Sequence, residues 1–510
     1  MGRQARAGQR WARWRPRRRL RHRRPRRRRR SRHPRRPDPA LDLRHPYRPP
    51  RTPHEGARRR AQRGGPVKAG IVGAGVAGLA AARRLQELGH EVTIFEGRDE
   101  PGGQVVTFEV GGEPIECFYH HIFTNDTTVV RYFDDLGLGD RLEWIEPHNG
   151  HFVKGRVYPF VTPLDLLRFD AVSLPSRIRL GLASLWLKRQ ADWRVYEDVT
   201  ARAWMERAVG KQAFDAFWGP LLRGKFAEHA DEIGMAWLHW KIRLRFGSRE
   251  GRLGAKETLG YPRGSFRSYY FALADHIREA GGRIHLSTPV ESVVTELGAV
   301  TGIRADGAFH EFDQVLMTTP NIITKRIAPD LPASYVEILD RVRYQWASCL
   351  VLALDRPLSD VYWLSIADDL PFVACVEHTN LVGAERYGGN HLVYLSNYVA
   401  PDHPVLQMDA EEALTAYEDS IRRINPAFDR SWVREKWFFR DPGGQPVITT
   451  NYSASIPSME TGIGGLYLSN TTQVYPEDRG QNYSLRLGEQ AAELMDAAAR
   501  AVAGARGARI

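Results

Sequence analysis

The chain has 510 residues, 42% of them hydrophobic, so it is long enough for two or three structural units with ordinary cores. It holds no run of eighteen or more apolar residues, and its three cysteines (Cys117, Cys349 and Cys375) show no CxxC or zinc spacing. The sequence therefore predicts no transmembrane segment, no metal site, and buried thiols in a reducing compartment.

The net charge of +13 is unevenly distributed along the chain. Residues 1–66 hold 26 arginines and three acidic residues, which leaves the remainder acidic, at about −10. This Arg- and Pro-rich segment has almost no apolar material, so we expect it to be disordered. It lacks the apolar stretch of a secretory signal. A tail for anionic surfaces and a start codon placed too far upstream both remain open, and we do not expect a nucleic-acid partner.

From residue 67 the pattern changes to strand, turn, helix and strand. The apolar run 69–72 predicts a buried parallel strand, and a glycine-rich turn leads from it into an amphipathic helix that Gly89 ends. A second strand, 91–95, delivers Glu96. This order predicts a dinucleotide site, because the helix N-terminus offers free N–H groups to a pyrophosphate and an acid about 20 residues on binds ribose hydroxyls. The turn and the first helical residues are Gly73, Ala74, Gly75, Val76, Ala77 and Gly78.

The residues after Glu96 read Gly-Arg98-Asp-Glu-Pro-Gly102-Gly103. This segment resembles the ExRxxxGG continuation of FAD enzymes in the amine oxidase, protoporphyrinogen oxidase and phytoene desaturase superfamily. The resemblance implies FAD as the cofactor. It also implies that Arg98, Gly102, Gly103 and the adjacent Gln104 line the cofactor.

A hairpin signal at 104–112 precedes a segment dense in aromatic residues and histidines, 117–126. Similar flavoproteins, including UDP-galactopyranose mutases with a GxHxFHT segment, place this stretch beside the flavin ring. The chain has His121-Ile-Phe-Thr without the second histidine of that pattern. Tyr119 and His121 are therefore candidate catalytic residues, and an ordinary aromatic-rich turn is the alternative.

Residues 163–249 form a helical pattern rich in Trp, Arg and Leu, for which the superfamily implies a cap over the flavin. Aromatic residues at helical spacing are more often core. The tryptophans are Trp186, Trp193, Trp204, Trp218, Trp237 and Trp240. Arg223, also a candidate catalytic residue, Lys225 and His239 could hold an anionic substrate, although each alone could be an ordinary surface or satisfied polar group.

The second half returns to the cofactor fold twice. The superfamily packs the backbone of a valine against the adenine, a role that falls on Val290, and a buried strand follows at 312–320. The polar segment 377–380 could face substrate or form a strand-edge turn. The last strand, loop and helix imply a flavin contact for Asn482 and Tyr483, and less firmly for Glu477 and Arg479, although Ser469-Asn470 replaces the usual Gly-acid pair.

The predicted fold is α/β, with a discontinuous Rossmann-like FAD-binding domain of the GR2 type, a mixed-sheet substrate domain and a helical cap. The expected boundaries are a tail (1–66), FAD-binding parts (67–165, 259–325 and 446–510), a cap (166–258) and a substrate domain (326–445).

The resemblance implies an FAD-dependent oxidoreductase that oxidises a small organic substrate through a non-covalent flavin. No second GxGxxG turn offers an NAD(P)H site, so oxygen, a quinone or another acceptor would reoxidise the flavin. The alternative is a flavin-dependent isomerase of the UDP-galactopyranose mutase type, acting on a nucleotide sugar. We expect a cytoplasmic location, with peripheral attachment to a membrane left open; substrate identity and oligomeric state are not predicted.

Overall fold

The computed structural model describes residues 66–159, 163–247 and 257–507. Residues 63–510 form one compact unit, and the predicted tail lies outside the described residues. In the part described, no helix is both long and apolar enough to cross a bilayer.

A five-stranded parallel sheet is assembled from three separate stretches of the chain. Its order is β10-β2-β1-β14-β20. The strands are β1 (Lys68–Val72), β2 (Glu91–Phe95), β10 (Arg283–His285), β14 (Gln314–Met317) and β20 (Leu466–Leu468). The first helix, α2 (Val76–Leu88), ends at Gly89, whose φ of 97° is the left-handed conformation expected of a helix-ending glycine.

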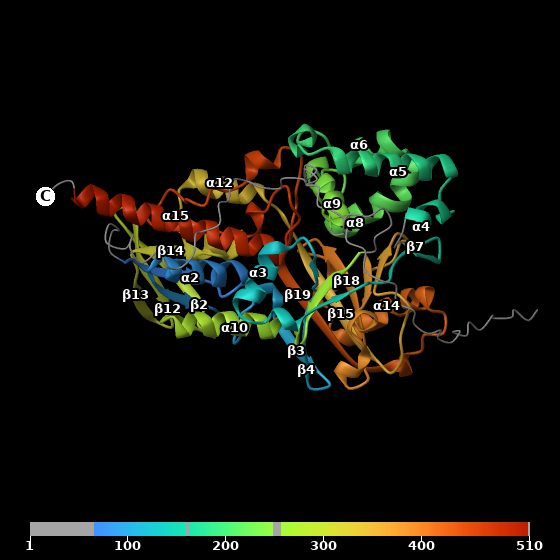
Figure 1. Ribbon diagram of the computed structural model, residues 1–510, viewed down its shortest axis with the longest axis horizontal. Helices are drawn as coiled ribbons and strands as arrows, with labels where there is room; N and C mark the ends of the chain where they lie inside the picture. The colour runs from blue at the N-terminus through green and yellow to red at the C-terminus, as the bar shows by residue number, and fades with distance from the viewer. Residues whose placement is uncertain (1–65, 160–162, 248–256, 508–510) are drawn as a thin grey trace, which may run out of the picture. The chain divides into compact units, whose positions relative to one another are not determined.

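The two faces of this sheet are covered differently because alternate side chains of a strand point to opposite faces. Ile71, Ile94 and Leu316 pack with α2, α10 (Ser265–Glu279) and α15 (Gln481–Gly507). Val72, Phe95 and Met317 pack with the three-stranded sheet β11-β12-β13. Those strands are β11 (Val290–Glu296), β12 (Ala299–Ala305) and β13 (Ala308–Glu311). Figure 1 shows α2, α10 and α15 running along the parallel sheet.

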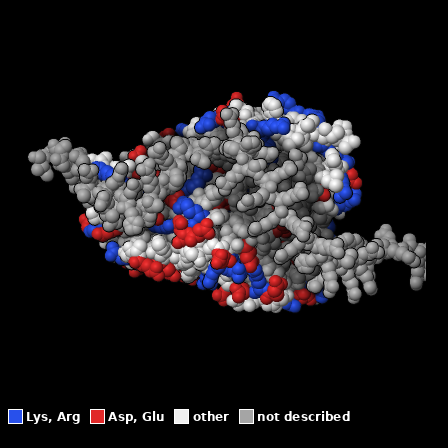
Figure 2. Space-filling model, viewed as in Figure 1, with Lys and Arg blue, Asp and Glu red and all other residues white. Residues whose placement is uncertain are grey.

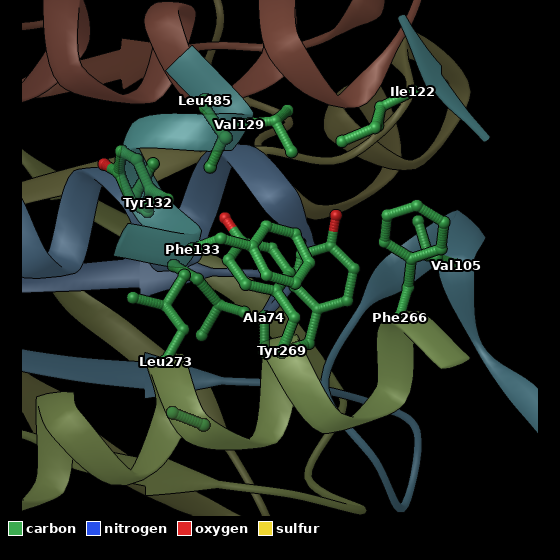
Figure 3. Packing of buried hydrophobic residues seen from close by; sticks show 14 of the residues in the cluster. Ala74, Val105, Ile122, Val129, Tyr132, Phe133, Phe266, Tyr269, Leu273 and Leu485 are labelled. Carbon is green, nitrogen blue, oxygen red and sulfur yellow. The ribbon is translucent and has the colours of Figure 1, made fainter. Parts of the chain in front are cut away.

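The helices over the sheet meet around the glycine-rich turn. Figure 3 shows side chains of α3 (Thr127–Asp135), α10 and α15 lying around Ala74, with Phe133 and Tyr269 stacked at 4.6 Å. The α15 helix crosses α2 closely, because a Cβ on Gly488 would lie 2.2 Å from the carbonyl oxygen of Ala77. The C-terminal helix is thereby held against the first helix.

A second, seven-stranded sheet is mixed, with the order β19-β15-β18-β17-β16-β7-β8. Only the β16–β7 pairing is parallel. The strands are β7 (Asn149–Val153), β8 (Arg156–Pro159), β15 (Tyr344–Leu354), β16 (Trp363–Ile366), β17 (Ala374–Glu377), β18 (His391–Val399) and β19 (Val433–Pro446). Helix α14 (Ala410–Ile424) packs on it through Leu414, Tyr417 and Ile421.

The segment between β8 and residue 247 is helical and has its own core. Its helices are α4 (Pro163–Arg168), α5 (Leu174–Arg189), α6 (Ala201–Val209), α7 (Lys211–Ala213), α8 (Gly219–Phe226) and α9 (Met235–Gly247). Trp237, Phe226 and Leu187 are fully buried there. A parallel sheet built from distant segments, a mixed sheet and a helical segment together confirm the predicted fold class.

The predicted hairpin forms as β3 (Thr107–Val110) and β4 (Glu113–Glu116), and its last residue is a buried carboxylic acid. Glu116 accepts hydrogen bonds from the Phe266 backbone N–H at 2.7 Å and from the Tyr261 hydroxyl at 2.8 Å. Burial outweighs these bonds and raises the pKa of Glu116 to about 7.

We expect Glu116→Gln to flatten the pH dependence of stability between about pH 4.5 and 7. In this window native Glu116 is protonated and unfolded Glu116 is ionised, so wild-type stability falls as pH rises, by up to about 3 kcal/mol in total. Glutamine cannot ionise and removes that dependence. Urea unfolding at several pH values measures the difference, and parallel curves for the two proteins would contradict the expectation.

Candidate functional site

The glycine-rich turn after β1 is shaped by close backbone packing. Gly73 has a φ of +106°, and a Cβ at that position would lie 2.6 Å from the Thr318 hydroxyl. A Cβ on Gly78 would lie 2.0 Å from the Gly73 carbonyl oxygen. Gly75 is different, because the nearest atom to a Cβ there is the Gly103 Cα at 3.6 Å. The protein interior thus requires glycine at positions 73 and 78, but not at 75.

The paired glycines predicted to line the cofactor lie directly against this turn. Gly102 donates its N–H to the Ala74 carbonyl at 2.9 Å, and a Cβ on Gly103 would lie 2.9 Å from the Gly75 Cα. Both have positive φ, at +126° and +63°. Two segments separated in sequence by α2 and β2 therefore contact each other through backbone atoms, with no side chain between them.

Glu96 and Arg98 join the second strand to these two loops. The Glu96 carboxylate accepts hydrogen bonds from the N–H groups of Ala74 at 2.8 Å and Arg98 at 2.9 Å. The Arg98 guanidinium donates to the Gly103 carbonyl at 2.8 Å. The Ser287–Thr288 backbone donates to the carbonyls of Arg98 and Glu96, which brings the start of β11, and so Val290, to the same edge.

Gln104 connects this site to the mixed sheet. Its side-chain amide donates to the Gly443 carbonyl at 2.8 Å and to the Asp441 carboxylate at 3.2 Å, both on β19. Sequence reasoning predicted a cofactor role for Gln104 but not this contact, because no local pattern signals a pairing 337 residues away.

Near the C-terminus of the chain, Asn482 and Tyr483 lie in the first turn of α15, and both are buried. The Asn482 side-chain oxygen accepts from the N–H groups of Thr128 at 2.9 Å and Val129 at 3.3 Å, so it holds the N-terminus of α3. Glu477 lies 3.7 Å from the Arg486 guanidinium.

Two buried polar groups near α15 were missed by sequence reasoning. The Gln481 amide nitrogen and the Ser469 hydroxyl have no hydrogen-bond partner within the described part of the chain. Buried polar atoms without a partner are rare and often face a ligand. Gln481 opens α15 and Ser469 follows β20, so both belong to the strand-loop-helix that the sequence assigns to the cofactor.

The histidine-rich segment lies between α10 and the mixed sheet, since His120 contacts Phe266 on α10 and Tyr119 contacts Trp363 on β16. The Tyr119 ring meets Trp363 edge-on at 4.8 Å, and His121 Nδ1 lies 3.0 Å from the Tyr362 hydroxyl. His120 Nδ1 lies 2.7 Å from the Phe118 carbonyl, to which it can only donate. Burial lowers the pKa of His121 to about 3 and that of His120 to about 4, so both are neutral at pH 7.

A buried charge cluster lies where the helical segment meets the loop before α15. The Asp478 carboxylate is 2.5 Å from Lys225 Nζ on α8 and 2.7 Å from Lys241 Nζ on α9. The next residue, Arg479, donates to the Tyr398 hydroxyl at 2.8 Å and to the Gln445 side chain at 3.1 Å. Two lysines thus share the Asp478 carboxylate, whereas Arg479 donates to two neutral groups and is influenced by the charges of both Asp478 and Asp441.

This cluster is electrostatically linked to the histidine-rich segment. Burial is the largest cause of the low pKa of His121, followed by Arg245, His120 and then Lys241, and Arg479 adds to the lowering of the pKa of His120 by burial. Sequence reasoning named Lys225 and Arg479 separately, but missed Lys241 and Asp478. Their pairing joins α8, α9 and the C-terminal loop, which only the tertiary structure brings together.

The other predicted polar candidates have different surroundings. Arg223 is exposed on α8. His239 is fully buried in the helical segment, with Nε2 at 3.1 Å and 3.0 Å from the Leu187 and Gln190 carbonyls. Glu377 accepts from the N–H groups of Leu358 and Ser359, which favours the strand-edge turn for that segment.

A pocket of about 470 Å³ opens beside the hairpin. Arg98, Arg267 and Arg440 line it together with Phe108 and Phe439. It reaches Cys117 and Phe118, the first two residues of the histidine-rich segment.

Comparison with known proteins gives one family and several distant relatives. The family described as flavin containing amine oxidoreductase matches residues 76–477. The 15-cis-phytoene desaturase of Arabidopsis thaliana is 26% identical over 327 residues, 58% of this chain and 56% of that protein. The protoporphyrinogen oxidase of Nicotiana tabacum is 25% identical over 302 residues, 54% of each chain. The chain thus spans about half the length of these two relatives.

Among solved structures, a reduced UDP-galactopyranose mutase has a TM-score of 0.66 at 18% identity, covering 84% of this chain and 93% of that one. At this identity the likeness shows the fold alone. The resemblance predicted from the motifs is confirmed for all three relatives and for the family.

The residues present fit FAD, the cofactor of this family. A Cβ-free backbone at Gly75, paired glycines facing it and unpartnered buried polar groups at Gln481 and Ser469 are what a long dinucleotide requires along its length.

Proposed function

Because the chain belongs to the flavin-containing amine oxidoreductase family, we propose that it is an FAD-dependent enzyme that oxidises a small organic substrate carrying an anionic group. The glycine turn, Glu96, Arg98 and the start of α15 would hold the cofactor. FAD, when bound, supplies the acceptor for a hydride or electrons from the substrate. Tyr119 and His121 are the proposed groups beside the reacting bond.

The observation that carries the substrate class is the excess of positive charge around Asp478. Lys225 and Lys241 pair with Asp478, and Arg479 is influenced by Asp478 and Asp441, so three cations face these two carboxylates in a largely buried region, where burial makes an uncompensated cation costly. A substrate carboxylate or phosphate would supply the missing negative charge. Arg223 is too exposed to contribute in the same way.

The cysteines support a flavin held without a covalent link. Cys117, Cys349 and Cys375 are all free and buried, and burial raises the pKa of Cys117 to about 12. A thiol that stays protonated is a poor nucleophile. Oxygen or a quinone is the proposed electron acceptor, and the cytoplasm the proposed location.

The decisive experiment is an anaerobic screen with the purified, flavin-loaded protein. Amines, porphyrinogens, polyenes and their carboxylated or phosphorylated analogues would be added, and flavin bleaching recorded. We expect bleaching by an anionic compound and at least tenfold slower bleaching by its neutral ester. Equal rates for acid and ester would refute the anionic class, and no bleaching by any compound would refute the oxidoreductase.

The alternative of a flavin-dependent isomerase keeps the same site. The diphosphate of a nucleotide sugar would also supply negative charge to Lys225 and Lys241. Conversion of such a sugar only after chemical reduction of the flavin, with no net bleaching, would support the isomerase instead.

We expect substrate binding to weaken above about pH 8. Burial lowers the pKa of Lys241 to about 8, and although Asp478 opposes this shift, Lys225 and Arg245 add to it. Above that pH Lys241 loses its charge and its attraction for an anion. KM for the anionic substrate should rise with pH, and Lys241→Met should give a high KM that is less dependent on pH. Arg223→Met is the matched control, which should keep the wild-type profile.

A further inference from the structure

The cap has an apolar face that is exposed rather than buried. Helix α5 carries a row of large hydrophobic side chains that remain between 48% and 63% exposed. They are Leu174, Ile178, Leu182, Leu185 and Trp186. Their spacing of three and four residues places them on one side of the helix. On α4, Leu164 and Leu167 are exposed to a similar extent.

The exposure is confined to one side of α5, because the other side of the helix is buried. The opposite side of α5 buries Leu180, Ala183 and Leu187 in the core of the helical segment. The tryptophans of this region were expected to be mostly core, and Trp237 is, whereas Trp186 projects outward. Adjacent exposed apolar side chains on this scale mark interaction surfaces in soluble proteins.

The charges around this face are predominantly positive. Residues 163–190 contain five basic and two acidic residues, although the chain beyond residue 66 is acidic overall. Arg177 and Arg179 donate to backbone carbonyls, which are neutral and leave the guanidinium charge in place. In Figure 2, white residues and blue Lys and Arg lie together at the upper right, where Figure 1 places α4 and α5.

We propose that the exposed apolar face of α4 and α5 docks on the surface of an anionic phospholipid bilayer. Leucine side chains enter the acyl boundary, Trp186 lies at the headgroup level, and the flanking Arg and Lys side chains meet the lipid phosphates. This peripheral contact is independent of the oxidation proposed above. A neutral protein partner would use the leucines but not the positive charge of the surrounding residues.

The test is co-sedimentation of the full-length, flavin-loaded protein with vesicles of phosphatidylcholine, with and without phosphatidylserine. The arginines of residues 1–66 would also attract anionic vesicles, so binding is compared at about 0.1 M and about 0.5 M salt, where exposed charges are screened. We expect binding to phosphatidylserine vesicles that partly survives the higher salt.

The decisive variant is Leu182→Ser combined with Trp186→Ser, which should lower the bound fraction at high salt at least tenfold. Ile322→Ser on α11 (Asn321–Ile327) is the matched control, because Ile322 is 62% exposed outside this face. Lys188→Gln with Arg189→Gln should weaken binding to phosphatidylserine vesicles only. Wild-type protein that stays in the supernatant, or a double serine variant that binds like wild type, overturns the proposal. A dimer that the serine variant dissociates, without lipid binding, would also overturn it by identifying a second copy as the partner.

Discussion

Gly75→Asp is expected to weaken FAD binding at least about 100-fold while leaving the protein folded. A Cβ at position 75 would meet only the Gly103 Cα at 3.6 Å, an ordinary van der Waals contact, so we expect the fold to accept a side chain there. A carboxylate there would lie where the pyrophosphate approaches the backbone, and like charges about 4 Å apart repel by about 4 kcal/mol near a protein surface. Flavin absorbance per protein after purification, and titration of the apoprotein with FAD, measure the loss.

The matched variant is Gly75→Asn, which has the same shape without the charge. It should retain more FAD than Gly75→Asp, and both should unfold near the wild-type apoprotein temperature. Gly78→Ala is different, because its methyl group would lie 2.0 Å from the Gly73 carbonyl and should lower stability itself. Wild-type FAD content in Gly75→Asp would refute the assigned cofactor site.

Asp478→Ala is expected to destabilise the protein by about 3–5 kcal/mol. The change leaves Lys225 and Lys241 facing each other without their carboxylate, and removing one partner of a buried ion pair leaves a buried charge uncompensated. Urea unfolding monitored by tryptophan fluorescence measures the effect. Asp419→Ala, a fully exposed carboxylate on α14, is the control and should change stability by less than about 0.5 kcal/mol.

The pH dependence of this effect has a definite sign. Burial alone would raise the pKa of Asp478, but Lys225 and Lys241 outweigh it and hold the pKa well below its usual range. The stability that the carboxylate contributes is therefore present above about pH 4, the unfolded value, and lost as pH falls below it. Adding Lys241→Met to Asp478→Ala should restore part of the stability, since one unpaired cation is removed. A double variant as unstable as the single one would contradict the electrostatic explanation.

The local structure of the proposed cofactor site could be predicted where its signals are local. The β1–α2–β2 unit, Glu96, Arg98 and the paired glycines lie within one stretch of sequence, and each residue type follows from backbone sterics or from anion binding at a helix N-terminus. The left-handed Gly89 and the hairpin before Glu116 were predicted for the same reason. Steric and periodic rules act over a few residues, so they can be derived from the order of residues alone.

The proposed substrate-binding cluster could be predicted only in part, because its groups come from separate segments: Lys225 was named as a candidate, but Lys241 and Asp478 were not. Lys225, Lys241 and Asp478 each look like ordinary surface charges in sequence, and only the packing of α8, α9 and the loop before α15 buries them together. His239, in contrast, was a candidate whose ring is satisfied by backbone carbonyls inside the cap. Burial depends on which distant segments meet, and a composition pattern does not contain that information.

The α4–α5 face shows the same division most clearly. Sequence alone determined a helical pattern rich in Trp, Arg and Leu over residues 163–249 and predicted a dinucleotide site at the glycine turn, because propensity, charge and turn chemistry are properties of neighbouring residues. Only the tertiary structure decided which apolar residues of α5 entered the core and which remained exposed, because one side of the helix was already occupied by α6 and α9. Hydrophobic side chains are interchangeable in sequence, and the packing around them decides which ones are left to meet a partner.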